Sequence, residues 1–193
     1  EAQLEDRWIK PVLEALGHHW SVQVKIRYRD KGFRKPDYAF AYTHQASQEL
    51  RNEIYTPDML QDVIAIGDAK KWGVKLDQSS GRDERNPSQQ IDEYLRYSEV
   101  KWGILTDGRY WRLYERSTSK DNTFYAVDLE SLLRYGEVED FYYFYLFFRR
   151  EAFAPAGWLE RILSGSVDYA ESLSDQLEDE VYNALELIAQ GFL

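Results

Sequence analysis

An apolar stretch in the first half of the chain ends in charged residues, and it constrains the fold more than any other feature. Residues 62–71 are rich in isoleucine, with Ile64 and Ile66 at the centre, which is typical of a buried strand. Alternate residues of a strand point to opposite sides, and here both sides are apolar. Asp68 and Lys70 therefore share one face at the end of a strand that we expect to lie inside a sheet.

The hydrophobic pattern elsewhere alternates between helix and strand periods. Apolar residues spaced three and four apart predict helices from Leu4 to Leu16, kinked at Pro11, and after Pro87. Strands are expected over 22–28, 33–42, 102–106, 110–115 and 124–129, with hairpin turns near 30–32 and at 107–108. This order predicts an α/β fold with a central mixed sheet flanked by helices.

The pattern becomes helical after Ser131 and stays so to the end of the chain. Apolar residues between Leu173 and Ile188 predict a last amphipathic helix. We therefore expect a core domain over 1–130 and a helical extension over 131–193. The chain has neither a long apolar run that would span a membrane nor a signal peptide, so no membrane partner is expected. The absence of cysteine excludes cysteine-bound metals and is compatible with the cytoplasm, the location that we expect.

The net charge of −10 argues at first against a nucleic-acid partner, but its distribution weakens that objection. Residues 151–193 contain nine acidic residues and one basic residue, so the first 150 residues carry only −2. Basic residues cluster over 25–35, where Asp30 is the single acid. Because local fields guide a polyanion to its site, this segment is a candidate contact for nucleic acid, although a solvated hairpin face explains it equally well.

A second acid, Asp37, follows a proline about thirty residues before Asp68. Burying such charges is costly unless a divalent cation compensates them. Mg²⁺ prefers oxygen ligands, so Asp37, Asp68 and the Ala69 carbonyl are candidate ligands. Lys70 would orient or deprotonate the attacking water, or bind the scissile phosphate, in phosphodiester hydrolysis. The alternative is an ordinary surface ion pair, which the apolar residues on both faces of the strand disfavour.

These residues resemble the signature of the PD-(D/E)XK nuclease superfamily. Pro36-Asp37 and Asp68-Ala69-Lys70 correspond to its two parts, although glutamate is more usual at position 68. Residues 90–94 (QIDEY) are similar to the Gln-x-x-x-Tyr motif on the helix after the catalytic strand. Residues 102–114 are similar to the strand–turn–strand that closes nuclease domains of type I restriction subunits and of type II enzymes fused to a methyltransferase. The resemblance implies a restriction-endonuclease-like core.

The resemblance further implies a metal-dependent DNA endonuclease domain of a restriction–modification enzyme, with Mg²⁺ as cofactor and Mn²⁺ as a substitute. Gln90 would assist catalysis from the helix face that it shares with Tyr94. Glu5 is the best candidate for the first-helix acid that often joins such sites as a catalytic and metal-binding residue, with Glu1 and Glu14 as alternatives. The extension would lead to a methyltransferase or specificity domain, fused or associated.

Double-stranded DNA is the expected substrate and partner. Basic residues on both sides of the catalytic strand would contact its phosphates, namely Lys25, Arg27, Arg34, Lys35, Lys71, Arg82 and Arg85. Two alternatives stay open. One is a nuclease-like module that binds DNA or assembles with partners without cutting, and the other is a repair- or RNA-directed nuclease of the same fold.

Overall fold

The computed structural model describes residues 2–29, 32–50, 53–79 and 85–166. The chain divides into two compact units, Glu1–Ala154 and Pro155–Leu193. In the second unit, residues 158–166 form a helix. The amphipathic helix expected over 173–188 lies outside the described residues, and the functional division expected at residue 131 stays a prediction.

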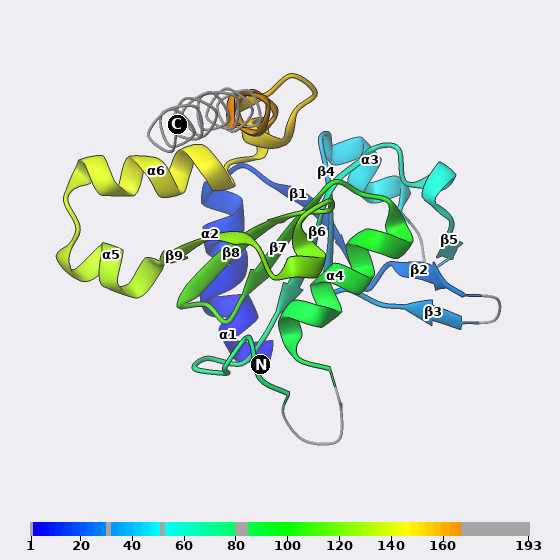
Figure 1. Ribbon diagram of the computed structural model, residues 1–193, viewed down its shortest axis with the longest axis horizontal. Helices are drawn as coiled ribbons and strands as arrows, with labels where there is room; N and C mark the ends of the chain where they lie inside the picture. Colours follow the sequence, from blue (N-terminus) through cyan, green and yellow to red (C-terminus); the bar gives the residue numbers. More distant parts are fainter. Residues whose placement is uncertain (1, 30–31, 51–52, 80–84, 167–193) are drawn as a thin grey trace, which may run out of the picture. The chain divides into compact units, whose positions relative to one another are not determined.

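A six-stranded mixed sheet forms the centre of the first unit (Figure 1). Its order is β1-β4-β6-β7-β8-β9, and all neighbours are antiparallel except β6 and β7, which are parallel. The strands are β1 (His19–Val22), β4 (Tyr38–Ala41), β6 (Val63–Ala69), β7 (Trp102–Thr106), β8 (Tyr110–Glu115) and β9 (Phe124–Asp128). The expected mixed sheet flanked by helices is confirmed.

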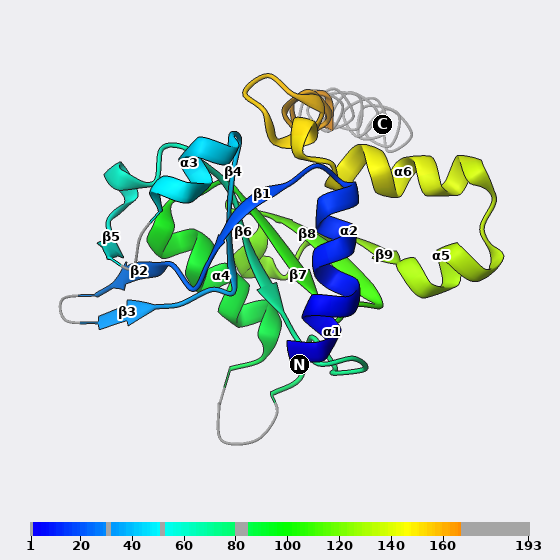
Figure 2. The same ribbon diagram turned by 180° about the vertical axis from the view of Figure 1, so that it is seen from behind.

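Helices cover both faces of this sheet, as the two opposite views show (Figures 1 and 2). One face carries α4 (Pro87–Ser98), and the other carries the N-terminal helix. That helix consists of α1 (Ala2–Leu4), a π-helical turn (Glu5–Ile9) and α2 (Lys10–Ala15). Pro11 has no backbone N–H to donate, and the widened turn directly before it lets the helix continue.

The core under α4 fixes how this helix lies on the sheet. Ile91 and Leu95 of α4 are fully buried in a cluster with Ile66 and Leu105 of β6 and β7. A Cβ atom on Gly103 of β7 would lie 3.0 Å from both α4 side chains, so the glycine permits direct contact between helix and strand. This packing holds the first turn of α4 close to the end of β6.

The expected strands 22–28 and 33–42 form a hairpin that bends between two sheets. Its near half, which belongs to the main sheet, is β1 paired with β4. Its far half, next to the turn, is β2 (Lys25–Tyr28) paired with β3 (Gly32–Arg34). The bend occurs at Gln23, with a φ of 57°, and at Pro36. The prediction of two continuous strands was therefore wrong, because the far half leaves the main sheet. It joins β5 (Ile54–Tyr55) in a separate three-stranded sheet.

Two helices after β9 cover the N-terminal-helix side of β8. They are α5 (Leu129–Tyr135) and α6 (Val138–Phe148). The buried Trp111 of β8 meets the rings of Phe144 and Phe148 edge-on, at centroid distances of 5.7 and 6.0 Å. The other face of α6 remains exposed, with Tyr142 60% exposed. The strongly aromatic segment of the sequence is thus half core and half surface.

Short elements complete the described chain. They are α3 (His44–Glu49) and the 3₁₀ turns Pro57–Met59, Ser119–Asp121 and Arg150–Phe153. The segment between β4 and β6 contains both α3 and β5. Among the described residues, no helix has the length and apolar character needed to cross a bilayer.

Candidate active site

The pairing of β4 with β6 brings together the two aspartates that the sequence singled out. The strands are antiparallel and Tyr38 pairs with Gly67, so the residue that precedes β4 lies beside the end of β6. Asp37 is held there by the backbone, because its Oδ2 accepts a hydrogen bond of 2.8 Å from the N–H of Ala69. This hydrogen bond holds Asp37 against β6, the strand that carries Asp68.

Lys70 lies at the centre of the candidate site. Its Nζ is 2.5 Å from Oδ2 of Asp68 and donates a 3.0 Å hydrogen bond to Oε1 of Gln90. Its backbone N–H bonds to the carbonyl of Thr106 at 2.8 Å, which continues the pairing of β6 with β7 beyond the strand. Asp68, Lys70 and Gln90 thus meet on the α4 face of the sheet.

The charge of Asp68 is held at an energetic cost. The side chain is 3% exposed, and this burial raises its pKa from 3.8 to about 7. The negative charge of Asp37 adds to the rise, whereas the positive charge of Lys70 opposes it. The pairing of Tyr38 with Gly67 sets Asp37 opposite Asp68, so the two carboxylates belong to neighbouring positions of adjacent strands. Near neutral pH, a second positive charge would favour the ionised form of Asp68.

Tyr94 lies one helical turn after Gln90 and faces the same carboxylates. Burial raises the pKa of its hydroxyl, and the charges of Asp68 and Asp37 raise it further. The Tyr94 side chain is 8% exposed and belongs to the core under α4. Of the 90–94 motif, Gln90 contacts Lys70 directly, and Tyr94 lies one turn further along the same helix.

Glu5 approaches from the other face of the sheet. It lies in the N-terminal helix, where its Oε2 accepts a 2.9 Å hydrogen bond from the hydroxyl of Tyr38, the residue after Asp37. It does not join Asp37 and Asp68, since no three acidic or histidine side chains among the described residues are close enough to hold one ion. Of the two alternatives, Glu14 is exposed on α2 and Glu1 lies outside the described residues.

The donor atoms present suit a cation that keeps part of its hydration shell. Asp68 Oδ2 is buried and accepts no hydrogen bond of normal angle from any described residue, although Lys70 Nζ is nearby. Mg²⁺ commonly binds proteins through one or two carboxylates and retains several waters. Asp37 and Asp68 fit that requirement, and the carbonyl of Ala69 as a third ligand stays a prediction.

Two of the basic residues expected to contact DNA are held by a carboxylate that the sequence analysis missed. Oε2 of Glu93 lies 3.1 Å from Nε of Arg34 and 2.5 Å from Nη1 of Arg85. The guanidinium of Arg34 also covers the ring of Tyr28, at 3.6 Å from its centroid. Glu93 precedes Tyr94 on α4, so this ion-pair cluster borders the candidate site.

The remaining basic residues of the prediction are spread over two surfaces. On β2, Arg27 is exposed and pairs across the hairpin with Phe33, whose ring lies 5.3 Å from the ammonium of Lys25. Lys35 and Lys71 are exposed on either side of the aspartates in the chain. Arg82 lies outside the described residues.

Comparison with known proteins gives one remote likeness. No protein-family model matches the chain, and no curated protein sequence matches it either. Among solved structures, it is similar to a fragment assigned to the HsdR subunit of a type I restriction enzyme from Vibrio vulnificus YJ016, with 14% identity and a TM-score of 0.40. The match covers 66% of this chain and 22% of the other, so the matched part spans about a fifth of the length of that chain.

Proposed function

We propose that this chain is a metal-dependent nuclease domain that hydrolyses phosphodiester bonds of double-stranded DNA. The observation that carries the proposal is the meeting of Asp37, Asp68, Lys70 and Gln90 at the end of β6, although these residues come from three separate parts of the chain. Membership of a restriction–modification enzyme is part of the proposal and rests on the sequence resemblance described above.

The carboxylates of Asp37 and Asp68 would hold Mg²⁺, or Mn²⁺ in its place. A bound divalent cation would supply positive charge for the phosphate oxygens and acidify a bound water. Asp37 contributes a carboxylate whose position is fixed by the N–H of Ala69. Asp68 contributes a buried carboxylate whose Oδ2 lies 2.5 Å from Nζ of Lys70.

The lysine would act on the water or on the scissile phosphate. Its ammonium is held between the carboxylate of Asp68 and the amide oxygen of Gln90, so its position is set from two elements, β6 and α4. The side chain is still 20% exposed, which leaves access from solvent. Gln90 therefore serves as a positioning residue for Lys70 in this proposal.

The exposed basic residues would hold the DNA backbone. Arg27, Lys35 and Lys71 are exposed, so they can exchange water for phosphate at little cost. Such contacts position the duplex without reading its sequence, and they make binding weaker as salt concentration rises. Arg34 and Arg85 would contribute from within their ion-pair cluster with Glu93.

Cleavage assays with Lys70→Ala test the proposal. Plasmid DNA with Mg²⁺ or Mn²⁺ is the substrate, and Lys120→Ala, at an exposed lysine of the Ser119–Asp121 turn, is the matched control. We expect Lys70→Ala to lose roughly 100-fold or more in rate and the control to keep full activity. Full metal-dependent cleavage by Lys70→Ala would defeat the assignment.

Metal titration distinguishes a metal-dependent nuclease from a nuclease-like module that binds DNA without cutting it. Calorimetry with Mn²⁺ should detect binding in the wild-type chain that is lost in Asp37→Asn and Asp68→Asn. Absence of such binding, together with retained DNA affinity, would favour the module that binds without cutting. Single-stranded DNA and RNA substrates, run beside the duplex, identify a repair- or RNA-directed nuclease.

A further inference from the structure

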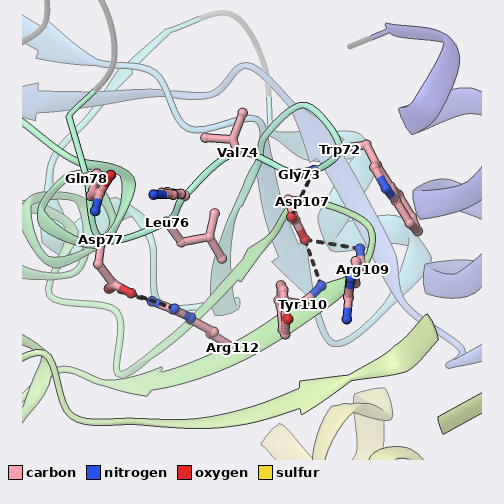
Figure 3. A pocket seen from close by; sticks show the side chains of 11 residues that line it. Trp72, Gly73, Val74, Leu76, Asp77, Gln78, Asp107, Arg109, Tyr110 and Arg112 are labelled. Atoms are coloured by element: carbon pink, nitrogen blue, oxygen red, sulfur yellow. Dashed lines mark hydrogen bonds and ion pairs between the residues drawn. The ribbon is translucent and has the colours of Figure 1, made fainter. Parts of the chain in front are cut away.

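A cavity of about 440 Å³ opens between the segment that follows β6 and strand β8 (Figure 3). Residues 72–78 form one wall, and residues of the β7–β8 turn and of β8 form the other. The first of these segments begins two residues after Lys70. Sites for small ligands have volumes of roughly 300–1,000 Å³, so the cavity is large enough for one.

The cavity and the candidate active site lie on the same face of the sheet. Tyr110, Arg112 and Tyr114 are two residues apart on β8, so their side chains point to the same side of the sheet. Tyr114 is buried there in the core under α4. Asp68 and Lys70 face α4 as well, through Gln90. β8 is two strands away from β6, which places the two features about 10 Å apart across the sheet.

Two large aromatic rings line the cavity and remain accessible. Trp72 is 49% exposed and Tyr110 is 39% exposed. Each ring lies against a residue of the turn between β7 and β8. The guanidinium of Arg109 lies 4.9 Å from the centroid of Tyr110, and a Cβ on Gly108 would lie 3.2 Å from Cε3 of Trp72. Glycine at position 108 therefore lets the turn approach the indole closely.

A buried carboxylate holds the two walls together. Asp107 is fully buried, and its Oδ1 accepts hydrogen bonds from the backbone N–H groups of Arg109 and Tyr110 at 3.1 and 2.7 Å. Its Oδ2 accepts a 3.2 Å bond from the N–H of Gly73 in the opposite wall. Figure 3 shows all three bonds converging on this side chain. The cavity is thus formed before any ligand enters.

Two of the three basic side chains that line the cavity are paired with acidic residues. Arg112 is engaged by Asp77 through two contacts of 2.7 Å, and Arg109 is engaged by Asp128 at 2.6 Å. The ammonium of Lys75 has no acidic partner among the residues that the structure describes. The cavity therefore combines accessible aromatic faces with an ammonium group, which suits a flat aromatic base that carries a phosphate.

We propose that this cavity binds one unstacked nucleotide of the DNA strand whose phosphodiester lies at Asp68 and Lys70. The base stacks on Trp72 or Tyr110, and the adjoining phosphate meets Lys75. The inference rests on the proposed nuclease function. Removing a base from the duplex costs stacking energy, which contacts with aromatic side chains and hydrogen-bonding groups in a pocket can offset.

Binding of a duplex with one unpaired, bulged nucleotide tests the inference. We expect the full chain, in EDTA, to bind this duplex more tightly than the fully paired one, because the bulged base is already unstacked. Trp72→Ala or Tyr110→Ala, whichever removes the ring on which the base stacks, should weaken binding of the bulged duplex by roughly 5- to 150-fold. Trp72→Phe, which keeps a ring, should restore most of the affinity. Tyr142→Ala, at an exposed ring of α6, is the matched control and should bind as the wild type does.

Photocrosslinking and cleavage distinguish the outcomes. A 5-iododeoxyuridine at the bulge should crosslink to Trp72 or Tyr110, as identified by mass spectrometry. Crosslinks found only elsewhere, or Ala variants that bind the bulged duplex unchanged while the wild type still cleaves DNA, would overturn the cavity inference and leave the nuclease proposal intact. A wild-type chain that neither binds nor cleaves DNA overturns both.

Discussion

Replacing Asp68 with asparagine should remove a pH-dependent cost that the ionised carboxylate imposes on the fold. Burial raises the pKa of Asp68 from 3.8 to about 7 in the folded chain. Between these two values the folded chain keeps a proton that the unfolded chain has lost. Wild-type stability therefore falls as the pH rises through this window. Asparagine has no proton to lose, so its contribution does not change over the same range.

The size of the effect follows from the two pKa values. Each unit of difference between the folded and unfolded pKa corresponds to 1.36 kcal/mol, so the full cost is roughly 4 kcal/mol. The cost is absent below pH 3.8 and complete above about pH 7. We expect the free energy of unfolding of Asp68→Asn, relative to that of wild type, to be about 4 kcal/mol larger at pH 8 than at pH 4, so the variant gains relative stability as the pH rises.

Urea unfolding in EDTA, followed by tryptophan fluorescence from pH 4 to 8, measures this difference. Comparing the change with pH, rather than the stability at one pH, cancels the constant loss of the contact between residue 68 and Lys70. Asp62→Asn is the matched control, because Asp62 is exposed at the start of the same strand. Its difference from wild type should stay constant.

A difference between Asp68→Asn and wild type that does not change with pH would refute the reasoning. It would mean that Asp68 ionises as readily in the folded chain as in solvent, and that the site needs no compensating cation. The converse measurement adds Mg²⁺ at pH 8. Ligand at 100 times its dissociation constant stabilises a fold by about 2.7 kcal/mol, and we expect this gain in wild type and its loss in Asp68→Asn.

Two further predictions concern the packing of the first unit's core. Gly67→Ala should destabilise the fold by about 1–3 kcal/mol in urea unfolding, because its Cβ would lie 2.6 Å from Cε2 of Phe40; an unchanged midpoint would contradict this close approach. Burial lowers the pKa of His18 from 6.5 to about 4, so wild type should lose roughly 3 kcal/mol as the pH falls through that window. His18→Phe should lack this loss, and parallel pH profiles of the two proteins would argue against a neutral buried imidazole.

The sequence predicted the site best where each signal was local. Isoleucine on both faces of one stretch identified β6 as a central strand, and the order of elements placed it in a mixed sheet. Asp37 was expected inside a strand over 33–42, whereas β4 begins only at Tyr38. The antiparallel pairing of β4 with β6 and its register bring Asp37 next to Asp68, and no local pattern in the sequence specifies that pairing.

The bent hairpin and the ion-pair cluster had no such local signal. Apolar and polar residues alternate without interruption on both sides of Gln23, so the pattern does not show that the two halves join different sheets. Glu93 is 59 positions away from Arg34 in the chain, and no sequence period relates them. Glu5 was favoured as the acid of the first helix, but the helix carries it to the opposite face of the sheet, where its carboxylate accepts a hydrogen bond from Tyr38.

If Asp37 and Asp68 bind a cation as proposed, the pairing of Tyr38 with Gly67 makes that affinity depend on folding, because the pairing brings the two carboxylates together. Before β4 and β6 align, the two aspartates are independent monodentate groups on a flexible polymer, each too weak to retain an ion by itself. If the chain is the nuclease proposed above, a nascent or misfolded copy would accordingly not cut DNA, because it could not bind the cation. Divalent-ion uptake would then serve as a reporter of correct strand alignment that needs no attached label.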